Sequence, residues 1–258
     1  MNMKLFDSHA HLQDPRVADT MDAMMDRARK IGVTRILSCG TREGDWGALT
    51  ALAGRHPEIL PAYGVHPWFI ETLSPDWVNA LGQRLTESRA AVGEIGLDFV
   101  VAGLDRGKQE AVFLAQLRLA RALKRPVSIH CRKAWGRMVE LLKQEGGLPH
   151  GGAIHSFSGS VEMVREFERL GVFFSFSGSI TRPNNLKAKK AAAAAAPDRL
   201  LIETDSPDIL PENIPGPLNE PAHVIQVVTT LATVRKTTPE KVADMTWNNA
   251  VGLFGSGG

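Results

Sequence analysis

The stretch Phe6-Asp7-Ser8-His9-Ala10-His11 follows a short apolar run that contains Met3 and Leu5. If a β-strand covers this stretch, alternate side chains share one face, so His9 and His11 point the same way. Two imidazoles on one face at the end of a buried strand form half of a metal site. A His-x-His pair is also common by chance, so its meaning depends on whether equivalent positions elsewhere supply the other ligands.

Short strand-like runs alternate with longer helical patterns along the whole chain. The strands are mostly continuous apolar runs, which is typical of a parallel sheet buried on both faces. We expect eight strands, at residues 4–8, 35–39, 60–65, 91–95, 127–130, 152–155, 172–177 and 200–204. Helical patterns follow at 16–31, 42–55, 75–88, 108–123, 134–145, 161–170, 184–196 and 221–235, with a last one at Pro239–Phe254. Ser74 and Thr238, each directly before a proline, are expected to cap the helices that follow them.

Eight strands, each followed by a helix, in 258 residues predict an α/β fold of the (β/α)8 TIM-barrel type. Such barrels usually have about 250 residues. An open, doubly wound parallel sheet is the alternative. No linker or change of composition divides the chain. We therefore expect a single barrel domain over residues 1–254 and a disordered tail at 255–258.

The composition is that of an ordinary globular protein, with 43% hydrophobic and 22% charged residues. The formal net charge of +2 creates no overall field that attracts nucleic acid or a membrane, so an acidic substrate requires a local site. No apolar run is long enough to span a bilayer, and no membrane partner is expected. The two cysteines, Cys39 and Cys131, fit reduced thiols in a cytoplasmic enzyme.

Polar residues recur where the predicted strands end, which is where barrels of this type carry their reactive groups. Glu94 and Asp205 end the fourth and eighth strands. Five of the eight histidines occupy such positions, namely His9, His11, His66, His130 and His155. We interpret the other three as surface or structural residues, namely His56, His150 and His223.

Four of these histidines, together with the two carboxylates, form a nitrogen and oxygen ligand set that suits borderline divalent ions. Six ligands exceed the need of one tetrahedral ion, so we expect two divalent metal ions (Zn²⁺, Mn²⁺ or Mg²⁺). The predicted ligands are His9, His11, Glu94, His130, His155 and Asp205. We expect the first two and Asp205 to hold one ion, His130 and His155 the other, and Glu94 to bridge them. Asp205 is then placed to hold the nucleophilic water and accept its proton.

Seven motifs appear in order along the chain: Asp7-Ser8-His9-Ala10-His11, Gly64-Val65-His66-Pro67, Gly93-Glu94-Ile95-Gly96-Leu97-Asp98, Pro126-Val127-Ser128-Ile129-His130-Cys131-Arg132, His155-Ser156-Phe157-Ser158-Gly159, Glu203-Thr204-Asp205-Ser206-Pro207 and Asn219-Glu220-Pro221. From Asp7 to about Phe254 the chain resembles the TatD family of metal-dependent deoxyribonucleases, within the amidohydrolase superfamily. The resemblance implies a TIM barrel, a divalent-metal site and hydrolysis of DNA phosphodiester bonds, often as a 3′-to-5′ exonuclease. It also implies the same six metal ligands. We expect Glu94 and Asp205 to be the catalytic residues.

Other residues near the strand ends are candidates for substrate contacts. His66 is expected to donate to a phosphate oxygen. Arg132 either binds a phosphate through two donors or forms a surface salt bridge. Glu203 either orients a ligand histidine or is a buried structural acid. Three aromatic residues either stack on a base or pack at the barrel rim, namely Trp68, Phe99 and Phe157.

Two segments depart from the family pattern. Residues 214–218 read Ile-Pro-Gly-Pro-Leu where the family often has basic residues, and the loop at 99–108 is rather apolar. An amide, ester or lactone hydrolase on the same barrel site therefore stays open as an alternative, and a metal-stabilised scaffold without activity is the third reading. Glu94, where many binuclear amidases carry a modified lysine, favours phosphoryl chemistry. We expect DNA as the substrate and a monomer.

Overall fold

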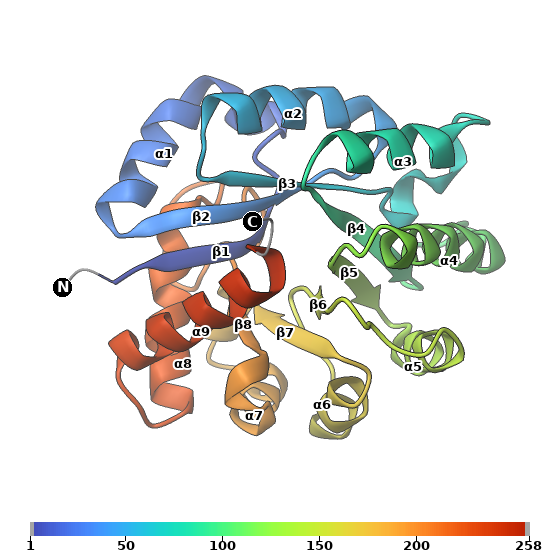
Figure 1. Ribbon diagram of the computed structural model, residues 1–258. Coiled ribbons are helices and arrows are strands. Elements are labelled where there is room, and N and C mark those ends of the chain that lie inside the picture. Colours follow the sequence, from blue (N-terminus) through green and yellow to red (C-terminus); the bar gives the residue numbers. More distant parts are fainter. Residues whose placement is uncertain (1–2, 256–258) are drawn as a thin grey trace.

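The computed structural model describes residues 3–255 and has the predicted TIM-barrel architecture, with helices surrounding a ring of strands (Figure 1). The eight strands form one parallel sheet in which chain order and spatial order are the same. The open, doubly wound alternative is therefore wrong. The strands are β1 (Leu5–Ala10), β2 (Val33–Cys39), β3 (Ile59–Tyr63), β4 (Ala91–Asp98), β5 (Val127–Arg132), β6 (Gly152–Ile154), β7 (Val172–Phe176) and β8 (Leu200–Ile202). Of the predicted tail, residues 256–258 lie outside the described part of the chain.

The helices pack against the outside of the strands because their apolar faces complete the buried layer between helices and sheet. The α-helices are α1 (Met21–Lys30), α2 (Trp46–Arg55), α3 (Trp77–Glu87), α4 (Arg106–Ala122), α5 (Trp135–Gln144), α6 (Val161–Glu168), α7 (Leu186–Ala194), α8 (Val224–Val234) and α9 (Pro239–Phe254). Short 3-10 helices occupy several connections, namely η1 (Pro15–Thr20), η2 (Glu43–Asp45), η3 (Pro67–Thr72), η4 (Gly178–Thr181), η5 (Pro197–Arg199) and η6 (Pro221–His223). None of the described helices is long and apolar enough to cross a membrane.

The N-terminal end of the barrel is closed by apolar packing. Phe6 lies in a cluster of small and aliphatic strand residues, and α9 crosses this end of the barrel (Figure 1). The rings of Trp247 and Phe254 lie 6.1 and 6.4 Å from the ring of Phe6. Polar chemistry is therefore confined to the opposite, C-terminal end of the strands.

Backbone hydrogen bonds join the ends of β1 and β8 and bring their polar residues together. The amide of Asp205 donates to the carbonyl of His9 over 2.9 Å, and the amide of His11 donates to the carbonyl of Ser206 over 2.6 Å. The barrel is thus nearly closed at its C-terminal end. As a result, residues that are about 200 positions apart in the chain share one site.

Helix starts depend on polar groups that local sequence does not fully reveal. Ser74 is not a helix cap, because its hydroxyl and amide both donate to the carboxylate of Glu43, at 2.7 and 2.8 Å. Helix α3 begins later than predicted, at Trp77. Thr238 caps α9 as predicted, since its side chain accepts from the amide of Lys241.

Gly96 allows β4 and β5 to approach each other beside the site. Its φ is +148°, and a Cβ at this position would lie 1.9 Å from the carbonyl oxygen of His130. We expect Gly96→Ala to lower the free energy of unfolding by about 3 kcal/mol or more, because backbone rather than a flexible side chain must move. Chemical denaturation measures this change.

Gly136 provides the matched control, because a Cβ there meets nothing within 4 Å and the residue lies in α5. We expect Gly136→Ala to be neutral or to stabilise the fold by up to about 1 kcal/mol. Equal stability of the two variants would show that β4 and β5 do not need a glycine at this point.

Candidate metal centre

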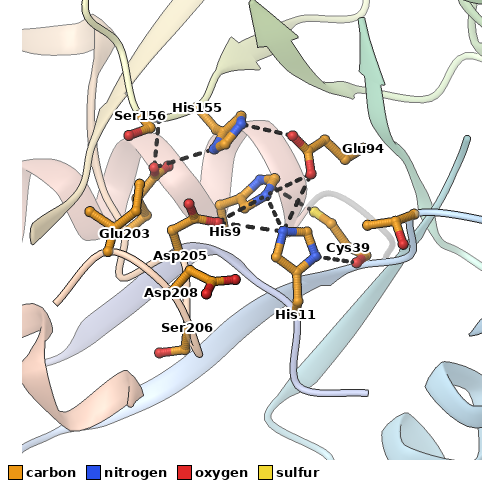
Figure 2. A network of polar contacts seen from close by, with 12 residues as sticks. His9, His11, Cys39, Glu94, His155, Ser156, Glu203, Asp205, Ser206 and Asp208 are labelled. Carbon is orange, nitrogen blue, oxygen red and sulfur yellow. Dashed lines mark hydrogen bonds and ion pairs between the residues drawn. The ribbon is translucent and has the colours of Figure 1, made fainter. Parts of the chain in front are cut away.

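The six predicted ligands converge on one point at the C-terminal end of the barrel. His9, Glu94 and His130 lie on β1, β4 and β5. His11, His155 and Asp205 follow the ends of β1, β6 and β8 by one to three residues. Figure 2 shows five of the six side chains pointing toward one another.

Glu94 lies between two pairs of histidines and presents a different oxygen to each. Its Oε2 lies 3.5 Å from His9 Nε2 and 3.3 Å from His11 Nε2. Its Oε1 lies 2.9 Å from His130 Nδ1 and 2.8 Å from His155 Nε2. This division matches the two predicted ligand groups, and a carboxylate in this position is suited to bridge two ions.

Asp205 completes the group on the β1 side. Its Oδ1 lies 3.4 Å from His11 Nε2 and 3.8 Å from His9 Nε2. Its backbone is left-handed, with a φ of +59°, and its carbonyl accepts from the amide of Asp208 over 2.8 Å. Aspartate tolerates this conformation better than most residues, so the tight turn itself directs the carboxylate toward the histidines.

The donor set fits divalent cations. Three groups of side chains each offer ligand atoms that lie within 4.8 Å of one another, namely His9–His11–Glu94, His9–His155–Asp205 and His66–Glu94–His130. All of these ligand atoms are imidazole nitrogens or carboxylate oxygens, which suit Zn²⁺ and Mn²⁺.

His66 belongs to one of these groups, although it was predicted to contact substrate. Its Nδ1 accepts from the amide of Trp68 over 3.1 Å, and its Nε2 lies 3.4 Å from Glu94 Oε1. Burial holds the pKa of His66 well below its usual range, so the ring is neutral. With Nδ1 accepting, the ring proton is on Nε2, so His66 can donate a hydrogen bond toward the cavity, as a substrate contact would require.

The second ring nitrogen of each ligand histidine faces a polar atom of the protein. Such contacts fix the tautomer and the orientation of a metal-binding imidazole. Three of these contacts are hydrogen bonds: His9 Nδ1 to Ser128 Oγ at 2.9 Å, His11 Nδ1 to the Cys39 carbonyl at 2.8 Å and His130 Nε2 to Asp98 Oδ2 at 3.2 Å. His155 Nδ1 faces Glu203 Oε1 at 3.6 Å, beyond hydrogen-bond distance.

Three of these partners were not found from the sequence, namely Ser128, Cys39 and Asp98. The sequence could have identified Asp98 as a site residue, because it ends the Gly93–Asp98 motif at the end of β4. Of the two readings of Glu203, the orienting one agrees with the geometry: its Oε1 accepts from the Ser156 amide over 2.6 Å and faces His155 (Figure 2).

Charge within the cluster shifts the histidines away from their usual protonation. Burial alone lowers the pKa of His11, but contacts with Asp205 and Glu94 outweigh it and raise the pKa well above the usual value. Burial likewise lowers the pKa of His155, and the charges of Glu94 and Glu203 raise it well above the usual value. Protons on these two rings therefore balance the negative charge of the carboxylates, as the positive charge of a divalent ion would.

Metal binding is expected to release protons and to tighten as the pH rises from about 6 to about 8. The reason is that the raised pKa values keep His11 and His155 protonated near neutral pH, whereas a metal ligand must be neutral. Calorimetric titration of the metal-free protein with Zn²⁺, in buffers of different ionisation enthalpy, counts the released protons. An affinity that does not change with pH, without proton release, would contradict this charge balance.

A cavity of about 720 Å³ opens above the cluster and contains both predicted substrate contacts, His66 and Arg132. Trp68 also lines it. Phe157 does not: it is buried, and its ring packs 4.8 Å from that of Phe174. Of the two readings of Phe157, packing is therefore correct.

The remaining histidines lie outside this cavity. His56 is buried, with Nε2 3.5 Å from Asp22, and the Nδ1 of His223 lies 2.9 Å from Asn219 Oδ1. Their interpretation as surface or structural residues agrees with these positions. Cys39 and Cys131 are both buried and unpaired.

Comparison with known proteins identifies the family. Residues 6–255 match the model of the family described as "TatD related DNase". A relative named uncharacterized metal-dependent hydrolase YabD, from Bacillus subtilis, is 34% identical over 97% of this chain and 98% of its own. The 3′-5′ ssDNA/RNA exonuclease TatD of Klebsiella pneumoniae is 32% identical over 97% and 98%. The crystal structure of YJJV, a TatD homologue from Escherichia coli K12, superposes with a TM-score of 0.94 at 31% identity and covers 99% of both chains. The chain therefore belongs to the TatD-related DNase family of metal-dependent hydrolases.

Proposed function

We propose that the protein hydrolyses phosphodiester bonds of DNA with two divalent metal ions (Zn²⁺, Mn²⁺ or Mg²⁺), removing nucleotides from the 3′ end of a single strand. The observation that carries this proposal is the position of Glu94, whose two oxygens face two separate pairs of histidines. Family membership and the printed activity of the Klebsiella relative support the choice of substrate.

The predicted ligands would divide into His9, His11 and Asp205 on one side of Glu94 and His130 and His155 on the other. Bound there, divalent ions supply an activated water at neutral pH and stabilise negative charge on phosphate oxygens. The protein's own part is to fix the geometry, through the contacts behind each imidazole, and to exclude solvent from the buried carboxylate of Glu94.

Asp205 is suited to take the proton of the attacking water. Burial raises its pKa, but the neighbouring histidines, led by His11, outweigh burial and lower the pKa below the usual value. The carboxylate is therefore ionised at neutral pH and can accept a proton.

Two further residues are placed to hold the phosphate. His66 carries its proton on Nε2, which faces the centre and can donate to a non-bridging oxygen. The guanidinium of Arg132 lines the same cavity and is suited to bind phosphate through two donors. Since all of these groups come from one chain, we propose that the protein acts as a monomer. We also propose that it acts in the cytoplasm, where the unpaired Cys39 and Cys131 would stay reduced.

A labelled substrate tests the proposal. A single-stranded oligonucleotide that carries a fluorophore at its 5′ end should shorten stepwise in the presence of Mg²⁺, Mn²⁺ or Zn²⁺, and a chelator should stop the reaction. Shortening from the 5′ end would show that the proposed 3′-to-5′ direction of digestion is wrong. Intact DNA, together with hydrolysis of a panel of esters, lactones or amides by the same metal-loaded protein, would assign the site to the alternative class of substrates.

A further inference from the structure

Asp98 is a buried carboxylate that holds two side chains at the wall of the cavity. Its Oδ2 accepts from the indole Nε1 of Trp68 over 2.8 Å and lies 3.7 Å from the NH1 group of Arg132. The same oxygen lies 3.2 Å from His130 Nε2. One atom thus connects a predicted metal ligand to two residues that line the cavity.

Asp98 itself is fixed in place. Its Oδ1 accepts from the amide of Val100 over 2.9 Å, and its backbone amide and carbonyl pair with the side chain of Gln109 at 2.8 and 2.9 Å. The carboxylate is therefore a rigidly held acceptor for the indole.

Trp68 is an exposed aromatic side chain whose orientation is nevertheless fixed. It is 47% exposed, although its one polar atom is already paired with Asp98. The rings near it, those of His66 and His130, are inclined to it at 81° and 67°. Among residues 3–255, no ring stacks in parallel on the indole. A large apolar face is thus left free at the wall of a polar cavity.

The free indole is close to the proposed site of cleavage. The ring centroids of Trp68 and His66 are 4.8 Å apart, and His66 Nε2 lies 3.4 Å from Glu94. Arg132 is beside it, 52% exposed, and its guanidinium makes no hydrogen bond within the described chain. A flat apolar surface next to a half-exposed cation, whose ion pair with Asp98 is long at 3.7 Å, complements a nucleotide, in which a flat base is joined to a phosphate.

We propose that Trp68 and Arg132 form a nucleotide subsite in which the indole stacks on the base of the nucleotide next to the cleaved bond and the guanidinium binds its phosphate. This proposal rests on the proposed function and adds how the substrate is held. Every base has a stacking face, so the subsite selects for the presence of a base rather than for its identity. Asp98 acts as the positioning residue for both side chains.

Paired oligonucleotides test the subsite. One carries an ordinary 3′-terminal nucleotide and the other an abasic analogue at the same place. We expect the wild-type protein to cleave the first with a kcat/KM about 5- to 100-fold higher, the range that stacking on an aromatic ring supplies. Trp68→Ala should bring this ratio close to one. Trp68→Phe keeps a stacking face without the bond to Asp98 and should retain most of the ratio.

Trp135→Phe serves as the matched control, because Trp135 packs against Phe157 and Phe167 away from the cavity. It should leave the ratio at the wild-type value. Circular dichroism melting verifies that each variant is folded. A ratio near one in the wild-type protein, or one that Trp68→Ala leaves unchanged, overturns the subsite while the nuclease activity stands.

Fluorescence gives a readout that does not need cleavage. An oligonucleotide with phosphorothioate linkages at its 3′ end should quench tryptophan emission of the metal-loaded protein, and its abasic counterpart should quench less. Trp68→Phe should remove this difference, although four of the five tryptophans remain. Base-dependent quenching by a protein that cleaves no DNA would retain the subsite and reject the proposed function. Equal quenching by both oligonucleotides, in a protein that cleaves DNA, would reject the subsite and retain the proposed function.

Discussion

Replacing Glu94 with glutamine is expected to lower the rate of metal-dependent hydrolysis by at least about 1,000-fold. The physical reason is that the carboxylate presents one oxygen to His9 and His11 and the other to His130 and His155. An amide has the same size but offers only one oxygen, and its NH₂ group meets the other pair of rings. The negative charge that would hold two ions together is also lost.

The measurement combines steady-state kinetics with metal analysis of the purified protein. We expect Glu94→Gln to bind fewer ions per chain than the wild-type protein. Glu71→Gln is the matched control, since Glu71 lies on η3 with a side chain that is 57% exposed and paired with Lys108. Glu71→Gln should change neither the rate of hydrolysis nor the metal content. Full metal content and activity in Glu94→Gln would contradict the bridging role.

Replacing Asp205 with asparagine is expected to lower kcat by about 100- to 10,000-fold, the range for loss of a general base. Asparagine accepts the left-handed backbone that Asp205 requires at a φ of +59°, so the turn is retained. The variant therefore loses the negative charge, a predicted metal-ligand oxygen and the proton acceptor near His11 without a change of fold. Alanine does not tolerate the left-handed backbone as well, so Asp205→Ala would combine a change of the turn with the loss of the carboxylate.

Asp208→Asn provides the control within the same turn. Asp208 also lines the cavity, but its side chain is 56% exposed and ion-paired with Arg16 at 2.9 Å. Salt bridges this exposed contribute little, so we expect kcat within about 3-fold of the wild-type value. If the two variants lose activity equally, Asp205 has no special role in proton transfer.

The barrel could be predicted because its signals are local. Mostly continuous apolar runs marked the eight strands, with ends shifted by a few residues. The rule that reactive groups follow strand ends brought His9, Glu94 and Asp205 to one place. The spacing of side chains along a strand is enough for such an inference, since alternation is fixed by backbone geometry.

The contacts behind the ligands could not be predicted in this way. The bond from His9 to Ser128 joins residues 119 positions apart, and the bond from His130 to Asp98 depends on the rotamers of both. The buried position of Phe157 could not be predicted either. The turn at Ser156, with a φ of +42°, directs the next residue away from the cavity. Its amide then donates to Ser175 on β7, at 2.9 Å.

Anomalous diffraction from crystals grown with Zn²⁺ or Mn²⁺ tests the central claim most directly. The arrangement of ligands predicts two peaks, one on each side of Glu94. The first should lie beside His9, His11 and Asp205, and the second beside His130 and His155. Peaks only elsewhere in the molecule, or a single peak that Glu94 does not contact, would contradict a binuclear centre at the end of the barrel.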